Sequence, residues 1–117
     1  MKRASLAAVL LLLASAGGAA AQSVGGRYEV RGTNPNGSGY SGTAEIYPNG
    51  NVCRIAWHVG SEWRGICMVS GNRFAASYQS GATAGLLIYR IQPDGSLAGE
   101  WTTGAGQTGT ETLIPMR

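Results

Sequence analysis

Hydrophobic and polar residues alternate along short segments of this chain, and turn-forming residues separate those segments at regular intervals. An alternation with a period of two is typical of β-strands that bury one face. The turn signals lie at residues 34–37, 48–50, 60–61, 70–72, 80–83, 93–95 and 104–109. Seven turns separate eight segments, so the pattern predicts an all-β fold, an eight-stranded antiparallel up-and-down meander barrel.

The central hairpin has the most strongly specified register. If the chain turns at Gly60, Cys53 lies opposite Cys67 and Trp57 lies opposite Trp63. We expect the two cysteines to form one cross-strand disulfide on the inner face. Such a bond closes a loop of about 15 residues and contributes roughly 3 kcal/mol in the chain-entropy model.

Three further turns set the register of their neighbouring strands. A two-residue loop at Asn49-Gly50 suits a type I′ turn, and the others lie at Gly71-Asn72 and Pro93-Asp94-Gly95. The expected pairs are Ile46 with Cys53, Val69 with Phe74, and Ile91 with Leu97. Each choice keeps apolar or small residues on one face, which a slip of one residue would turn outward.

The inner face that follows from these registers is rich in aromatic and aliphatic side chains. Gly42, Gly65 and Gly99 fall among them, where a glycine permits a bend or lets a ring lie across the backbone. The predicted inner face is Tyr28, Val30, Tyr40, Ala44, Ile46, Ile55, Trp57, Trp63, Val69, Phe74, Ala76, Tyr78, Leu87, Tyr89, Ile91, Leu97, Trp101 and Leu113, plus the cystine.

The first residues have the pattern of an export signal. Lys2 and Arg3 precede a short apolar run that ends in Ala19-Ala20-Ala21. This pattern predicts a signal peptide over residues 1–21 and a single β-barrel domain over residues 22–117. The apolar run is too short to span a bilayer. Export to the periplasm or the outside also suits a chain whose two cysteines form a disulfide.

Charge argues against a nucleic-acid partner. The whole chain has nine Lys and Arg against six Asp and Glu, a formal net charge of +3. Loss of Lys2 and Arg3 lowers this charge to +1, and the remaining arginines are scattered along the sequence. A basic stripe that could follow a phosphate backbone is therefore not expected.

The sequence offers little for catalysis. His58 is the single histidine and Asp94 the single aspartate, and Asp94 belongs to a turn. The cysteines are expected to be oxidised, which removes a thiol nucleophile. The spacings that bind metals or phosphate are missing. We therefore expect a protein that is not an enzyme and that needs no metal or cofactor.

Two interpretations of the inner face remain open. The aromatic residues Trp57, Trp63, Tyr78, Tyr89 and Trp101 either line a ligand pocket or form a packed core, and the narrow interior of eight strands favours the core. Glu111, the one acid with inward parity, is either a polar anchor in the pocket or a residue near the rim, solvated or paired with an arginine. The rim is favoured because buried acids are rare.

The outer face carries a second candidate surface. Ile66, Met68, Leu86 and Ile88 alternate outward on neighbouring predicted strands. Clustered apolar side chains on a surface are typical of contact sites. We expect a protein partner or self-association there.

Three segments resemble a known group of proteins. They are residues 32–46, 93–101 and 109–115, and they are similar to small exported bacterial proteins of unassigned activity, some of which carry a fibronectin-binding label. The cysteine pair is an addition to that pattern. By architecture alone, the meander also resembles avidin and lipocalin-like barrels, a likeness that implies a fold and no activity.

Together these patterns predict an exported binding module without catalytic activity. Its ligand is either a small apolar molecule inside the barrel or a protein on the outer apolar face. The alternative is a structural or inhibitor-like protein of the cell envelope that presents loops such as 34–39 and 104–109 on a rigid barrel.

Overall fold

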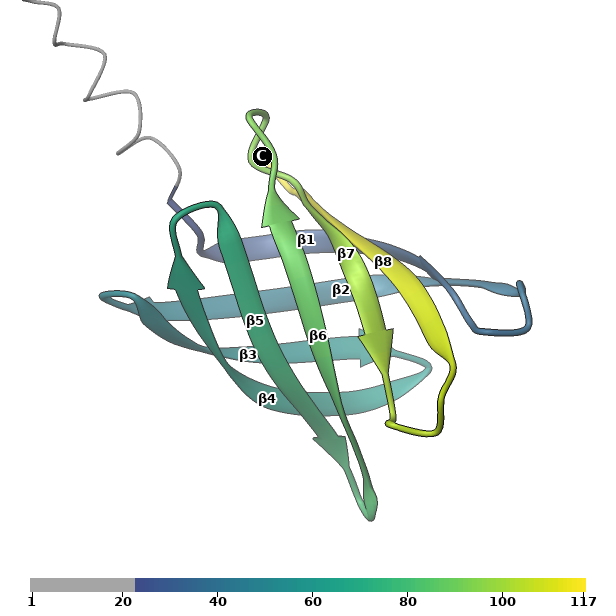
Figure 1. The fold of residues 1–117 in the computed structure, drawn as a ribbon. Coiled ribbons are helices and arrows are strands. Elements are labelled where there is room, and N and C mark those ends of the chain that lie inside the picture. Colours follow the sequence, from purple (N-terminus) through teal and green to yellow (C-terminus); the bar gives the residue numbers. More distant parts are fainter. Residues whose placement is uncertain (1–22) are drawn as a thin grey trace, which may run out of the picture.

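The computed structural model describes residues 23–117, which form a closed barrel of antiparallel strands in sequence order, with β1 paired to β8 (Figure 1). This arrangement confirms the predicted fold. The expected signal peptide lies outside the described residues. The strands are β1 Gly26–Thr33, β2 Gly39–Asn49, β3 Val52–Val59, β4 Ser61–Ser70, β5 Arg73–Ser80, β6 Thr83–Ile91, β7 Leu97–Thr102 and β8 Thr108–Pro115.

The central hairpin, β3–β4, has the predicted register. Cys53 pairs with Cys67, Trp57 pairs with Trp63, and Gly60 makes the turn with a φ of +73°. The cysteines form a disulfide with their Cα atoms 4.9 Å apart. Both cysteines are buried and belong to the core cluster, as expected from the sequence.

The β2–β3 hairpin differs from its prediction. Ile46 pairs with Ile55 instead of Cys53, because the two loop residues are Gly50 and Asn51 rather than Asn49 and Gly50. A glycine with positive φ at the first loop position suits a type II′ turn, in which only that residue needs positive φ. The register shifts by two residues, so every side chain stays on its predicted face.

The other two predicted hairpin registers are confirmed. Val69 pairs with Phe74, and Ile91 pairs with Leu97. The β4–β5 ladder is interrupted in its middle, where the Ile66 N–H donates to Ser77 Oγ at 3.1 Å.

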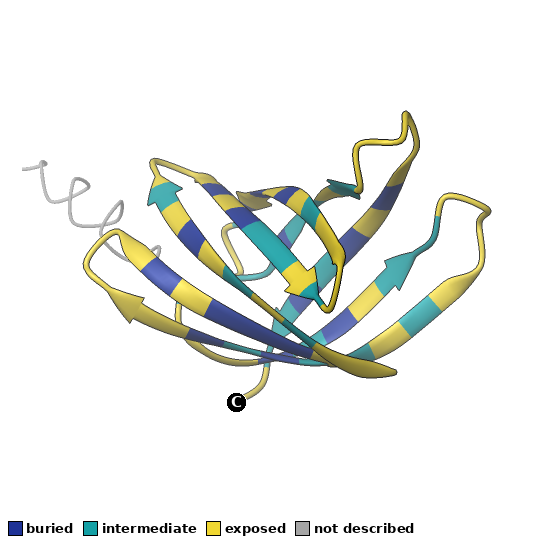
Figure 2. Ribbon diagram, turned by 90° about the horizontal axis from the view of Figure 1, so that it is seen from below, coloured by how far each residue is buried: buried dark blue, intermediate teal, exposed yellow. Residues whose placement is uncertain are grey.

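Buried and exposed residues alternate along the strands, as Figure 2 shows. Every residue of the predicted inner face either belongs to the buried core cluster or, in five cases, is partly buried and packs against it: Tyr40, Trp63, Val69, Tyr78 and Trp101. Val24 and Val59 also pack against the cluster. A Cβ at Gly42, Gly65 or Gly99 would collide with a backbone carbonyl of the neighbouring strand. These three glycines therefore allow strands to approach closely, as their positions in the sequence suggested.

Candidate binding cavity

The two ends of the barrel differ. One end carries the β1–β2, β3–β4, β5–β6 and β7–β8 loops, and the other carries the remaining loops and the C-terminus (Figure 1). The most deeply buried aliphatic side chains and the cystine fill the barrel toward the second end. Val30, Ile46, Ile55, Leu97 and Leu113 each expose 2% or less.

A cavity of about 430 Å³ opens at the first end. Four residues at or beside the loops mark its mouth: Asn34, Val59, Thr83 and Thr103. Its walls are Tyr40, Trp57, Trp63, Tyr78 and Trp101, with Glu111 among them. The volume lies within the range of small-molecule sites, and an apolar lining with a few polar groups is typical of such sites.

Glu111 lies on β8, directly opposite Gly32 of β1 and Gly99 of β7. Only 5% of the residue is exposed. Because neither neighbour has a side chain, the carboxyl group of Glu111 has space to extend across the barrel. It meets hydrogen-bond donors from strands β2, β3 and β6.

Three neutral donors hold the Glu111 carboxyl group. The Tyr40 hydroxyl donates to Oε1 at 2.7 Å, and the Trp57 indole N–H donates to Oε2 at 2.9 Å. The hydroxyl of Tyr89 also donates to Oε2. Trp57 and Tyr89 are themselves buried, so this cluster provides the partners that their polar atoms need.

The protonation of this cluster is shifted by burial. Burial raises the pKa of Glu111 above its ordinary value, and the hydrogen bonds from Tyr89, Tyr40 and Trp57 partly offset that rise. The pKa values of Tyr40 and Tyr89 are raised well above the ordinary phenol value by burial and by the nearby carboxylate. Both phenols are therefore donors at neutral pH.

The aromatic walls contact one another edge to face. The ring of Tyr78 is the centre of this group, with centroids 5.6 Å from Trp63, 6.2 Å from Trp101 and 6.4 Å from Trp57. Tyr40 and Trp101 are also edge to face, at 6.4 Å. Such contacts stabilise the wall and fix the orientation of its rings.

Three glycines make room for three of these rings. A Cβ at Gly32 would collide with the ring of Tyr40, and one at Gly85 would collide with the ring of Tyr78. Gly109 has the same relation to Trp101. The rings therefore lie flat across the backbone of the neighbouring strand and leave the centre of the barrel end open.

Five of the six predicted ligand-binding residues line the cavity. Trp57, Trp63, Tyr78, Trp101 and Glu111 line the cavity, whereas Tyr89 is fully buried and supports Glu111 from outside the lining. The favoured placement of Glu111 at the rim was wrong, because phenols and an indole satisfy the buried carboxyl group. That any of these residues binds a ligand stays a prediction.

Sequence reasoning left six lining residues out of the candidate site. Tyr40 and Leu87 had been placed on the inner face, so their parity was a usable signal, and Val59 has the same parity as Trp57 on β3. Asn34, Thr83 and Thr103 belong to the mouth, and their position depends on how the loops close around the barrel end. Nothing local in the sequence marks those three residues.

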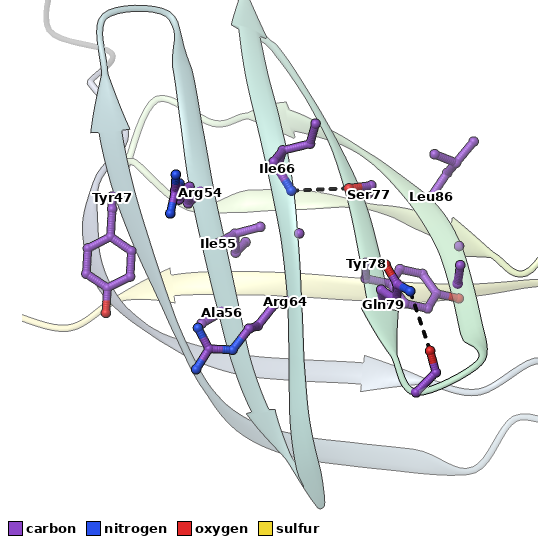
Figure 3. A pocket seen from close by; sticks show the side chains of 14 residues that line it. Tyr47, Arg54, Ile55, Ala56, Arg64, Ile66, Ser77, Tyr78, Gln79 and Leu86 are labelled. Atoms are coloured by element: carbon purple, nitrogen blue, oxygen red, sulfur yellow. Dashed lines mark hydrogen bonds between the residues drawn. The ribbon is translucent and has the colours of Figure 1, made fainter.

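The predicted outer surface is exposed in the structure. Ile66 exposes 69% of its surface and Leu86 exposes 62%, and Met68 and Ile88 are exposed as well. A wide, shallow groove lies beside the interrupted β4–β5 ladder, between Arg54 and Leu86 (Figure 3). That a protein binds this surface stays a prediction.

The residues considered for catalysis do not meet. His58 is exposed near the β3–β4 loop, at the cavity end, whereas Asp94 lies in the β6–β7 loop at the other end. Asp94 accepts hydrogen bonds from the Ser96 backbone N–H and hydroxyl, which lower its pKa. These two residues therefore cannot be the histidine and aspartate of a Ser-His-Asp triad.

Residues 23–117 contain no group of three or more His, Cys, Asp and Glu side chains that could hold a metal ion. Over the same part of the chain, no helix has the length and apolar character needed to cross a membrane.

Comparison with solved structures shows the fold. A redesigned β-barrel, mFAP1, whose structure contains bound DFHBI, has a TM-score of 0.70 and 18% identity over 83% of this chain and 98% of the other. A second redesigned barrel, b11L5F_LGL, has a TM-score of 0.67 and 19% identity over 85% and 96% of the two chains. A fluorescence-activating β-barrel of de novo design has a TM-score of 0.63 and 23% identity over 84% and 98%.

Sequence comparison adds no family. No family model matches the chain, and no curated protein is similar to it at a significant level. The resemblance to small exported bacterial proteins therefore stays an expectation, whereas the barrel architecture is supported by the structural neighbours.

Proposed function

We propose that this chain is a binding protein that takes up a small, mostly apolar molecule through the open end of its barrel. The observation that carries the proposal is the cavity of about 430 Å³, walled by aromatic rings with one buried carboxyl group among them. Rings held by edge-to-face contacts and by hydrogen bonds offer a preformed apolar site, so a ligand does not have to order them.

The structural neighbours support this proposal at the level of architecture. One of them was solved with the small molecule DFHBI, and another is described as fluorescence-activating. They show that a barrel of this shape can hold a small molecule. Fold likeness does not transfer a ligand, so the proposal depends on this chain's own cavity.

The compartment and the lack of catalysis belong to the same proposal. A buried disulfide suits an oxidising compartment, which supports export of the chain. The separation of His58 from Asp94 supports a role in binding rather than hydrolysis. Presentation of loops 34–39 and 104–109 on a rigid barrel remains the alternative, and it does not require an open cavity.

A titration with N-phenyl-1-naphthylamine tests the proposal. This neutral, apolar dye becomes fluorescent in apolar surroundings and accepts energy from tryptophan. All three tryptophans of the chain line the cavity, so binding there is expected to give saturable energy transfer.

Two neighbouring substitutions on β6 locate the dye. Thr83→Phe places a ring at the cavity mouth, whereas Ala84→Phe places the same ring on the outer groove. Dye affinity is expected to fall at least tenfold in the first variant and to stay within twofold in the second. Equal affinity in both variants, or no saturable binding, would contradict the proposal.

A further inference from the structure

The carboxyl group in the cavity has no cationic partner among the described residues. All three of its hydrogen-bond donors are neutral groups. The ion pairs found among residues 23–117 all involve other acids: Arg27 with Glu45, Arg31 with Glu29, and Arg64 with Glu62. A buried carboxylate normally pairs with a cation or takes up a proton. The free cavity therefore contains a carboxyl group without a cationic partner among the described residues.

One carboxylate oxygen retains capacity for a ligand. Oε2 of Glu111 accepts from both Trp57 and Tyr89, whereas Oε1 accepts from Tyr40 alone. A carboxylate oxygen can accept two hydrogen bonds. Since Glu111 also lines the cavity, Oε1 is the atom best able to face a positive group there.

The aromatic walls favour the same kind of ligand. Tyr78 and three tryptophans surround the cavity, and ring faces carry negative potential. A cation over such a face is attracted most strongly when water is excluded, with tryptophan as the best partner. Walls of this kind attract a cation much more than they attract an anion.

We propose that the ligand of this barrel is a small organic cation with an apolar body, an amine or a quaternary ammonium, whose charged group lies between the aromatic rings and Glu111. This inference rests on the proposed function and narrows its ligand class. A neutral ligand would shield the carboxylate from water and leave it without a counter-ion. A cation would instead pair with the carboxylate when water is excluded.

Protonation links this inference to pH. Burial raises the pKa of Glu111, and a bound cation would lower it again. The titratable groups that face the carboxylate are Tyr40 from β2, Tyr78 from β5 and Tyr89 from β6, and all three have raised pKa values. Glu111 is therefore the group in this cluster that loses its charge as the pH falls. Cation binding should weaken as the pH falls.

The test uses two molecules of the same shape that differ in charge. Benzyl(2-hydroxyethyl)dimethylammonium is a cation, and 3,3-dimethyl-4-phenylbutan-1-ol has carbon in place of its nitrogen. Each is used to displace N-phenyl-1-naphthylamine from the wild-type protein at pH 7.5. The cation is expected to displace the dye at a concentration at least ten times lower than the alcohol.

Glu111→Gln is the matched variant. The amide oxygen can take the place of Oε2, and the Tyr40 hydroxyl can turn to accept from the amide NH₂ in place of Oε1. The preference for the cation over the alcohol is expected to fall below threefold. A pH series on the wild-type protein gives the same information without a substitution, since the preference should shrink toward pH 5.

The outcomes separate this inference from the proposed function. Equal displacement by both molecules, or a preference for the alcohol, overturns the cation but leaves a cavity that binds small molecules. Dye binding that neither molecule reverses at millimolar concentration also overturns it. Failure of the dye to bind the cavity contradicts the proposed function itself.

Discussion

Replacing Glu111 by leucine would remove the acceptor that three donors share. The Trp57 N–H and the Tyr89 hydroxyl are buried, so both would lose their partner without gaining water. An unsatisfied buried donor costs about 1–3 kcal/mol, which gives a loss of about 2–6 kcal/mol for the pair. Tyr40 is half-buried near the open end and can turn to solvent, so its contribution is smaller.

Glu111→Gln is the control, because the amide retains an oxygen for Trp57 and Tyr89. We expect it to change the free energy of unfolding by less than about 1.5 kcal/mol, the value of a typical hydrogen bond. Urea denaturation at pH 7, followed by tryptophan fluorescence and circular dichroism, measures both variants. If the leucine variant matched the glutamine variant within about 0.5 kcal/mol, the hydrogen-bonded cluster would not contribute to stability as described.

At a pH just above the ordinary pKa of 4.5, Glu111 still holds its proton in the folded protein, whereas the unfolded chain has lost it. The stability of the wild-type protein should therefore fall as the pH rises through the raised pKa. Glu111→Gln should lack that slope in urea titrations between pH 4 and pH 8. Gly99→Ala would push a methyl group into a backbone carbonyl, so it should lower the free energy of unfolding by about 1–3 kcal/mol in the same assay. Gly39→Ala is the control: the nearest atom to its new methyl group is 3.7 Å away, so this variant should be neutral or stabilising. Removing the disulfide with Cys53→Ala and Cys67→Ala should cost about 3 kcal/mol by chemical denaturation, and an unchanged midpoint would contradict its role.

The sequence predicts the barrel because local signals agree with one another. The turn glycines, the alternation and the cysteine pair all assign the same residues to the inner face, and all of them belong to the core cluster or pack against it. The β2–β3 hairpin shows the limit of this reasoning. Asn49-Gly50 and Gly50-Asn51 are both acceptable loops, and parity cannot distinguish registers that differ by two residues.

The candidate site is less predictable, because it depends on distances across the barrel. Parity shows that Glu111 points inward, but its burial depends on Tyr40, Trp57 and Tyr89, which are 22 to 71 residues away in sequence. The same parity places Tyr89 and Trp101 on one face. Only its depth in the barrel distinguishes Tyr89, which is fully buried and supports Glu111, from Trp101, which lines the cavity.

The most direct test of the cavity is a nuclear magnetic resonance titration of the three indole N–H groups with N-phenyl-1-naphthylamine. Trp57, Trp63 and Trp101 all line the cavity, so saturable shifts of their signals report binding inside the barrel. The methyl signals of Ile66 and Ile88 report the outer face. We expect the indole signals to shift while these methyl signals stay unchanged. Shifts of the outer methyl groups with unchanged indole signals would contradict a ligand site inside the barrel.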